Sequence, residues 1–233
     1  MLRALIFDVD GTLAETEELH RRAFNDTFAA QGLGWEWDQP TYRELLRVTG
    51  GKERIAHYLT DHLGVAADHH DIPDLHRAKT DRFTELMSKG EITLRPGILR
   101  LIEAGRNAGL KLAIATTTSR PNIEALIRAT MGQPADQVFD AIAAGDEVDA
   151  KKPAPDVYLL ALERLGVAAP EAVALEDSLN GLASARAAGL ACVVSPATYT
   201  QGDAFPPDAV LIDGFDQITD IDALRALLVR ETA

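Results

Sequence analysis

The stretch LRALIFDVDGTLAETE, residues 2–17, decides the fold predicted for this chain. Its first six residues are almost all apolar, which is typical of a strand buried at the centre of a parallel sheet. Asp8 and Asp10 follow this strand, and residues two apart on an extended chain point to the same side. Two negative charges in one small space are unfavourable unless a cation lies between them. The stretch therefore indicates either an acidic site at a strand end or a solvated Asp-Gly turn.

The composition limits the class of protein. The chain has 233 residues, of which 46% are hydrophobic, so it can form one large α/β domain or a domain with an inserted module. It carries 36 acidic and 23 basic side chains, a formal net charge of −13. This charge argues against nucleic acid or an anionic membrane as a partner. An anionic small molecule is still compatible with it, because a bound cation can dominate a small site.

Apolar runs and cysteine content indicate the compartment. No apolar run approaches the roughly 20 residues that cross a bilayer, and residues 2–7 are too few for the apolar part of a secretory signal. The one cysteine, Cys192, lies in the apolar run 190–195, where we interpret it as a buried structural thiol. We therefore expect a cytoplasmic protein.

Short β-rich runs alternate with helical patterns in residues 93–233. Apolar residues recur at spacings of three and four in the helical patterns, with glycines near their ends. The expected strands are residues 2–7, 111–116, 139–144, 172–176, 190–195 and 209–212, and the expected helices are 98–109, 122–131, 155–166 and 179–189. This alternation predicts an α/β fold with a Rossmann-like, mostly parallel sheet, helices on both faces and residues 2–7 as a central strand.

Residues 14–92 have a different character. Their patterns are helical, no run among them is a convincing strand, and they contain all six histidines. We expect an all-helical cap domain at 14–92, inserted into an α/β catalytic core domain formed by residues 1–13 and 93–233. The run DHHD, residues 68–71, could suggest a metal site, but we interpret it as a solvated loop because nothing around it fixes a ligand geometry.

Polar side chains gather at one edge of the predicted sheet. The carboxyl ends of parallel strands meet at one edge, and ligands of open parallel sheets bind there. The residues that the chain delivers to this edge are Asp8, Asp10, Thr116, Thr117, Thr118, Ser119, Lys152, Glu176, Asp177 and Ser178. Carboxylates without histidine form an oxygen-only set, which Mg²⁺ prefers. Hydroxyls, an ammonium group and helix N-termini suit a phosphoryl group, so the pattern predicts a Mg²⁺ ion that bridges the acids and a phosphate.

Four motifs at this edge resemble those of the haloacid dehalogenase superfamily. They are DVDGT at residues 8–12, the strand that ends at Thr116, Lys152 before a proline, and EDS at residues 176–178, in the order that the superfamily has them. The helical insertion resembles the cap of the subfamily that contains β-phosphoglucomutase and many sugar-phosphate phosphatases. The resemblance covers essentially the whole chain and implies a phosphatase with a Rossmann-like core and a helical cap.

The resemblance implies a role for each matching residue. It assigns Asp8 as the nucleophile that forms an aspartyl phosphate, and Asp10 as the acid that protonates the leaving alcohol and the base that then activates water. It assigns Thr116 and Lys152 to the phosphoryl oxygens, where fixed positive charge stabilises the transferring group. The implied Mg²⁺ ligands are the Asp8 carboxylate, the Asp10 main-chain carbonyl, Asp177 and, directly or through water, Glu176.

The cap is expected to recognise the rest of the substrate. TGGKER, residues 49–54, combines two glycines that allow close backbone approach with two cations. For each charged residue, the alternative is a solvated helix surface. The candidate substrate-binding residues, including those implied by the resemblance, are Asp10, Glu17, His20, Gly50, Gly51, Lys52, Arg54, Lys79, Thr116, Thr117, Thr118, Ser119, Arg120, Asn122 and Lys152.

Within the superfamily, Glu17, TGGKER and TTTSRPN (116–122) are most similar to the CbbY branch. This resemblance implies Mg²⁺-dependent hydrolysis of xylulose-1,5-bisphosphate to xylulose 5-phosphate and phosphate, which removes an inhibitor of Rubisco from the Calvin cycle. A phosphomutase of the β-phosphoglucomutase type is an alternative, in which the phosphoenzyme must outlive reorientation of the intermediate. A non-catalytic sugar-phosphate sensor is another. The expected partner is a small-molecule sugar phosphate, and we expect a monomer.

Overall fold

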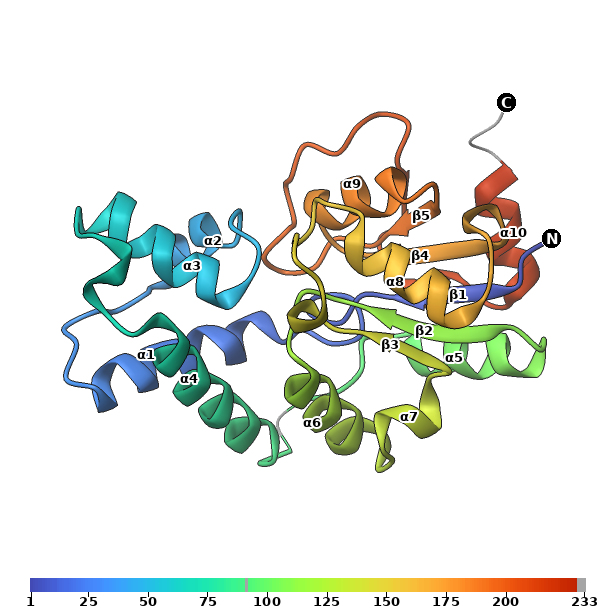
Figure 1. The fold of residues 1–233 in the computed structure, drawn as a ribbon. Helices are drawn as coiled ribbons and strands as arrows, with labels where there is room; N and C mark the ends of the chain where they lie inside the picture. The colour runs from blue at the N-terminus through green and yellow to red at the C-terminus, as the bar shows by residue number, and fades with distance from the viewer. Residues whose placement is uncertain (91, 230–233) are drawn as a thin grey trace.

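The central strand of the sheet is β1 (Ala4–Phe7), whose four residues are all buried. The structure, a computed structural model, describes residues 1–90 and 92–229. Six parallel strands form one sheet in the order β3-β2-β1-β4-β5-β6 (Figure 1). The other strands are β2 (Lys111–Ala115), β3 (Ala141–Ala143), β4 (Ala172–Glu176), β5 (Ala191–Val194) and β6 (Val210–Leu211). The predicted parallel sheet and its central first strand are confirmed.

Helices cover both faces of the sheet because the side chains of β1 alternate between them. Leu5 and Phe7 belong to an apolar cluster with residues of α5, α6 and α10. Ala4 and Ile6 belong to a second cluster, with residues of α8 and α9. The core helices are α5 (Ile98–Asn107), α6 (Arg120–Met131), α7 (Ala135–Val138), α8 (Asp156–Leu165), α9 (Leu179–Ala187) and α10 (Ile221–Val229). The Rossmann-like core is therefore confirmed.

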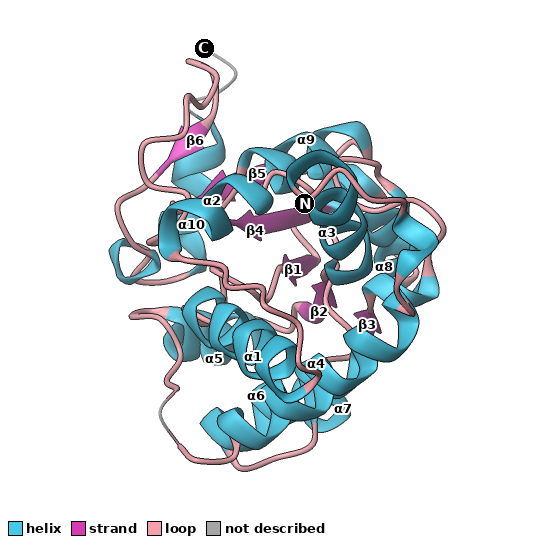
Figure 2. Ribbon diagram, turned by 90° about the vertical axis from the view of Figure 1, so that its left-hand side faces the viewer, coloured by secondary structure: helices cyan, strands magenta, loops and turns pink. Residues whose placement is uncertain are grey.

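An all-helical cap follows β1 and lies at one end of the sheet (Figures 1 and 2). It consists of α1 (Glu17–Ala30), α2 (Gln39–Leu45), α3 (Gly51–His57), a π turn (Tyr58–His62), a 3₁₀ turn (Ala67–His69) and α4 (Ile72–Met87). Aspartates start two of these helices, since the carboxylates of Asp38 and Asp71 accept hydrogen bonds from main-chain N–H groups of α2 and α4. The inserted helical cap agrees with the predicted fold class.

The cap has an apolar cluster of its own, rich in aromatic rings. Phe24 and Phe28 of α1 pack around Trp37, with ring centroids 4.5 and 5.0 Å from the indole. Tyr42 of α2 joins them. Tyr199, from the core loop that follows β5, completes the cluster. The cap therefore has a core that is separate from the sheet, and one side chain of the sheet domain is buried in it.

The two connections between the cap and the core run side by side. Ala14 and Leu94 form an antiparallel bridge, and the Arg95 N–H donates a hydrogen bond to the Leu13 carbonyl over 2.8 Å. Glu91, near the end of the predicted cap range, lies outside the described residues. The chain therefore leaves the core and returns to it at one place.

Three further expectations fall on peripheral features. Cys192 is buried on β5, as interpreted from the sequence. Within DHHD, residues 68–71, Asp71 starts α4 by accepting a hydrogen bond from the Asp74 N–H, and His70 packs edge-on against Trp35. None of the described helices combines the length and the apolar character needed to cross a bilayer.

Candidate active site

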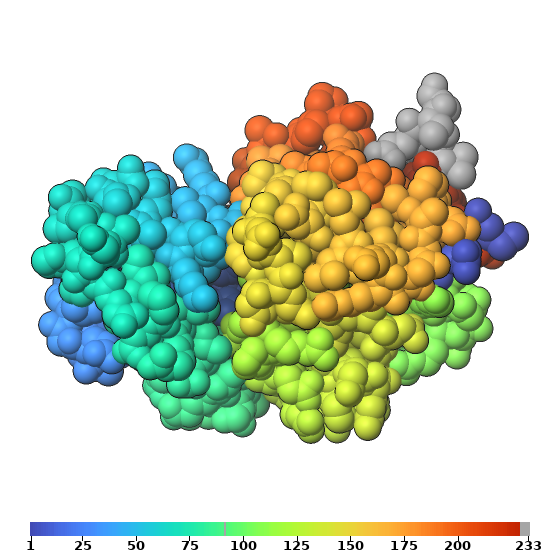
Figure 3. Space-filling model, viewed as in Figure 1, coloured from blue at the N-terminus to red at the C-terminus, as the bar shows by residue number. Residues whose placement is uncertain are grey.

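A cavity lies between the cap and the carboxyl ends of the strands, where the surface is hollowed at the junction of the two parts (Figure 3). The core contributes Asp8, Asp10, Thr116, Thr117, Thr118, Ser119, Asn122, Lys152, Asp177, Ser178, Asn180, Tyr199 and Thr200. The cap contributes Glu17, His20, Phe24, Leu46, Thr49, Gly50, Gly51, Arg54, His76 and Lys79. The edge of the sheet that the sequence singles out is therefore one wall of a cavity that the cap closes.

The turn after β1 packs closely against Asp177, the acid that follows β4. Gly11 has a φ of +84°, a conformation that side chains disfavour, and a β-carbon there would overlap the Asp177 carboxylate. Only glycine permits this close approach. Asp8 is only 6% exposed, which excludes the solvated turn as an account of DVDGT.

Lys152 pairs with two of the buried acids. Its ammonium group donates to Asp8 Oδ1 and to Glu176 Oε1, each over 2.6 Å, and to the Ala115 carbonyl over 2.9 Å. The Tyr158 hydroxyl also donates to Glu176 Oε1, over 2.6 Å. Burial raises the pKa of Asp8 to about 7, although the charge of Lys152 opposes this shift. Lys152 thus fixes the positions of both acids.

Negative charge exceeds positive charge in this cluster. Asp8, Glu176 and Asp177 offer carboxylate oxygens that all lie within 4.8 Å of one another, and all three residues are buried. Burial, followed by the charge of Asp8, raises the pKa of Asp177 well above its ordinary value. Three buried carboxylates beside one ammonium group form an oxygen-only set that lacks a compensating charge. These residues therefore fit a hard divalent cation.

The cap supplies hydrogen bonds to Asp10. Asp10 Oδ1 accepts from Thr16 Oγ1 over 2.6 Å and lies 3.0 Å from His20 Nε2. On the other side of the ring, His20 Nδ1 lies 2.5 Å from Lys79 Nζ. The three groups therefore form a chain in which Lys79 donates to His20 and His20 donates to Asp10.

The protonation of this chain follows from its burial and from the interactions among its members. Burial alone would raise the pKa of Asp10, but its interaction with His20 and the hydrogen bond from Thr16 outweigh burial and lower that pKa to about 2. Burial, then Lys79, lowers the pKa of His20. Burial lowers the pKa of Lys79 to about 7, and the charge of Asp10 opposes it. The arrangement holds Asp10 as a carboxylate.

A second polar group lies deeper in the cap. The Tyr42 hydroxyl donates to Glu17 Oε2 over 2.7 Å. Arg54 Nη1 donates to the Tyr42 oxygen over 3.1 Å, and Arg54 Nε donates to the Leu45 carbonyl over 3.2 Å. Arg54 lines the cavity and is 9% exposed, so its charge is directed at the cavity rather than at bulk solvent.

Unsatisfied polar atoms lie on the core wall. Asn122 Nδ2 donates to Thr118 Oγ1 over 2.9 Å, but Asn122 Oδ1 is buried without a hydrogen-bond partner among the described residues. Ser119 Oγ is also buried without a hydrogen-bond partner among the described residues. Both residues line the cavity, and buried polar groups ordinarily have partners, so these two atoms are suited to a polar ligand.

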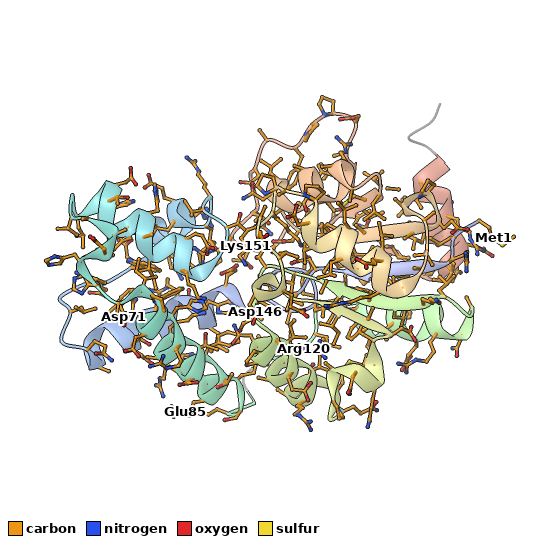
Figure 4. All side chains as sticks on the ribbon, in the orientation of Figure 1. Met1, Asp71, Glu85, Arg120, Asp146 and Lys151 are labelled. Atoms are coloured by element: carbon orange, nitrogen blue, oxygen red, sulfur yellow. The ribbon has the colours of Figure 1, made fainter. Side chains whose placement is uncertain are left out.

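Most of the residues predicted for the site line this cavity. Lys52 and Arg120 do not, because both are exposed and lie outside its wall. Figure 4 shows Arg120 on the core, at the start of α6, and Lys151, next to Lys152, at the edge of the core that faces the cap. Glu176 lies behind the wall, with both of its oxygens engaged by Lys152, Tyr158 and the Asp177 N–H.

Several lining residues were not predicted from the sequence. They are Phe24, Leu46, Thr49, His76, Asn180, Tyr199 and Thr200. Asn180 could have been found, because it follows EDS at the carboxyl end of a predicted strand. Tyr199 and Thr200 follow no strand end directly and belong to no periodic pattern, so no sequence signal points to them.

The comparisons with known proteins agree with this geometry. A family model described as haloacid dehalogenase-like hydrolase matches residues 2–189. The chain belongs to the haloacid dehalogenase-like hydrolases. The four motifs that suggested this superfamily all contribute residues to the cavity or to the acids directly behind it.

Three similar proteins are informative. Protein CbbY of Cereibacter sphaeroides is 58% identical over 224 residues, which are 96% of this chain and 97% of that protein. A crystal structure of CbbY from Rhodobacter sphaeroides, a D10N mutant in complex with xylulose-(1,5)bisphosphate, is 57% identical, with a TM-score of 0.92 over 96% of this chain and 99% of that one. A β-phosphoglucomutase from Clostridium difficile shares the fold, with a TM-score of 0.82 at 19% identity, over 100% of this chain and 99% of that one. The predicted superfamily, its CbbY branch and the class of phosphatase are confirmed.

Proposed function

We propose that this protein hydrolyses a phosphate ester of a sugar bisphosphate in a Mg²⁺-dependent reaction, with xylulose-1,5-bisphosphate as the substrate and xylulose 5-phosphate and phosphate as the products. One observation carries the proposal: a buried carboxylate cluster with a paired lysine and a cap arginine line the same cavity. The complex of the 57% identical CbbY with xylulose-(1,5)bisphosphate supports the choice of substrate.

Asp8 is the proposed nucleophile. Its carboxylate attacks phosphorus and forms an aspartyl phosphate, while the bond from phosphorus to the sugar oxygen breaks. Lys152 contacts Asp8 and orients its Oδ1. Thr116, at the end of β2, is placed to donate to a phosphoryl oxygen. Asp8, Asp177 and, from behind, Glu176 would hold Mg²⁺, which when bound would neutralise charge on the phosphoryl group.

Asp10 is the proposed acid and base. The negative charge of a bound phosphate favours the protonated form of a neighbouring carboxyl group, so Asp10 can protonate the leaving sugar oxygen. After the sugar leaves, His20 and Thr16 favour the carboxylate form again. As a carboxylate, Asp10 removes a proton from the water that hydrolyses the aspartyl phosphate. Because His20 and Lys79 belong to the cap, Asp10 is supported in this way only when the cap is closed.

The cap, proposed as residues 14–92, binds the part of the substrate that does not react. Arg54 supplies a buried positive charge for the second phosphate, and Glu17 accepts hydrogen bonds from a sugar hydroxyl beside Tyr42. Ser119 and Asn122 complete the hydrogen-bonding wall on the core side. In this proposal, the phosphate that reacts lies in the core, and the cap recognises the sugar.

A panel of sugar phosphates tests the proposal. Phosphate release is measured with xylulose-1,5-bisphosphate, with hexose and pentose monophosphates, and with β-glucose 1-phosphate primed by a bisphosphate, each with Mg²⁺ and with excess chelator. We expect the highest kcat/KM for xylulose-1,5-bisphosphate and no turnover in chelator. Isomerisation of the primed β-glucose 1-phosphate without phosphate release would instead identify a phosphomutase. Ligand binding without any turnover would identify a sensor.

A further inference from the structure

A core loop reaches from the sheet into the cap. It follows β5, and we call residues 195–201 the latch segment. The Ser195 N–H donates to the Glu176 carbonyl over 2.8 Å. The Arg95 guanidinium group donates to the carbonyls of Ser195 and Pro196, over 2.9 and 3.1 Å. The first residues of the latch segment are therefore fixed to the core.

The middle of the latch segment is fixed to the cap. The Tyr199 ring is 8% exposed and meets the Tyr42 ring edge-on, with centroids 5.6 Å apart. Its hydroxyl donates to Glu18 Oε2 over 2.6 Å. Arg43 lies over the same ring and donates to the Thr198 carbonyl over 3.2 Å. Tyr199 can make these contacts only while the cap is closed on the core.

The next residue contacts the acidic cluster instead. Thr200 Oγ1 donates to the Asp177 main-chain carbonyl over 2.7 Å and lies 3.3 Å from Asp177 Oδ2. It also accepts a hydrogen bond from the Ala197 N–H over 2.8 Å. Thr200 therefore fixes the main chain of Asp177 and restricts where its carboxylate can point.

We propose that Tyr199 and Thr200 are positioning residues that connect closure of the cap to the binding of Mg²⁺ at Asp177. The two residues share a peptide bond, so withdrawal of the Tyr199 ring from the cap moves Thr200 away from Asp177. Coupling of this kind is reciprocal: a closed cap strengthens Mg²⁺ binding, and bound Mg²⁺ favours the closed cap by the same factor. The inference rests on the Mg²⁺-dependent function proposed above.

The first experiment removes the hydroxyl of Thr200. Valine has nearly the same shape as threonine but cannot donate to Asp177, whereas serine keeps the donor. Mg²⁺ affinity is measured by isothermal titration calorimetry without substrate. Loss of a residue that orients a metal ligand typically weakens binding by about 10- to 100-fold, so we expect this for Thr200→Val and less than about threefold for Thr200→Ser. Equal Mg²⁺ affinities in the wild type and Thr200→Val would overturn the role of Thr200.

The second experiment acts from the cap and leaves the latch segment unchanged. Glu18→Ala removes the acceptor of the Tyr199 hydroxyl, and Arg43→Ala removes both the cation over the Tyr199 ring and the donor to the Thr198 carbonyl. We expect each to weaken Mg²⁺ binding by about fivefold, within the usual range of coupling between sites. The matched control is Arg77→Ala, which removes an exposed cap arginine paired with Asp74 within α4. A role of Tyr199 confined to cap stability would lower the thermal midpoint without changing the Mg²⁺ affinity.

Hydrogen exchange supplies the reciprocal readout. Mg²⁺ should slow amide exchange in the latch segment of the wild type, but not in that of Thr200→Val. Mg²⁺ affinities that are the same in the wild type and in both cap variants overturn the coupling while leaving the proposed function intact. A wild-type protein that does not bind Mg²⁺ overturns both.

Discussion

Replacing the proposed nucleophile, Asp8, with asparagine should stabilise the metal-free protein and abolish its activity. Burial raises the pKa of Asp8 from 3.8 to about 7, against the opposing effect of Lys152. Because an unfolded chain ionises this group more easily than the folded protein does, ionised Asp8 disfavours folding. One pKa unit corresponds to about 1.4 kcal/mol, so the shift corresponds to about 4 kcal/mol of lost stability at pH 8.

The sign of this effect sets its pH dependence. An acid whose pKa is raised in the folded state stabilises folding at pH values below the pKa that it has in the unfolded chain. This contribution is lost as pH rises from about 4 to about 7. Asp8→Asn has no such titration. Its advantage in free energy of unfolding over the wild type should therefore grow from under about 1 kcal/mol at pH 4 to about 2–4 kcal/mol at pH 8. The opposing effect of the ion pair with Lys152 is already contained in the raised pKa of Asp8.

Urea unfolding in excess EDTA, followed by circular dichroism at both pH values, measures this difference. Asp222→Asn, at an exposed aspartate of α10, is the matched control and should change little. Added Mg²⁺ should stabilise the wild type more than the variant, because the cation binds the ionised carboxylate. The kcat of Asp8→Asn should fall below about a hundredth of the wild-type value, which is at least 2.7 kcal/mol in the barrier. A variant less stable than the wild type at pH 8 in EDTA would refute the reasoning.

Three further outcomes are expected. With a sugar bisphosphate, Arg54→Ala should lower kcat/KM by about 10- to 150-fold, and Lys52→Ala should lower it by less than about threefold. With p-nitrophenyl phosphate, both variants should change kcat/KM little. Equal losses on the two substrates would contradict binding of a remote phosphate by Arg54. His20→Ala should move the acidic limb of the kcat–pH profile to higher pH, because it removes a donor that lowers the pKa of Asp10. His62→Ala, at an exposed histidine, is the control. An acidic limb that does not move in His20→Ala would count against Asp10 as the base. Ca²⁺ should inhibit the Mg²⁺-supported reaction, since Ca²⁺ prefers longer bonds and more ligands; equal turnover rates with the two cations would contradict this.

The sheet and its acidic edge could be predicted from the sequence because both follow from local patterns. The run at residues 2–7 is apolar on both faces, as a central parallel strand requires, and β1 lies at the centre of the sheet. The position of the acids then follows from the topology, since carboxyl ends of parallel strands share one edge. Asp8 and Asp177 are brought together in this way although 169 positions separate them.

The cap side of the cavity could be predicted only in part, because it depends on the rotation of helices about their axes. Lys52 and Arg54 are two apart on α3, and residues two apart on a helix point about 200° from each other. Only one of them can face the cavity, and the sequence alone does not give the rotation of α3. Tyr42 and Tyr199 reach the site through packing of the aromatic cluster, which has no counterpart in the spacing of the chain.

The base of the cap has a mechanical consequence. Phe83, Leu86 and Met87 of α4 belong to the same apolar cluster as Leu5 and Phe7 of the sheet. This end of the cap therefore packs against the core through buried hydrophobic surface. The far end, with α2 and α3, is held by polar contacts and by one aromatic ring. The firmest attachment of the cap is where α4 packs beside α6 (Figure 2). We therefore expect any opening of the cap to be largest at α2 and α3. We therefore expect the proposed substrate to enter, and the product to leave, at this end of the cap.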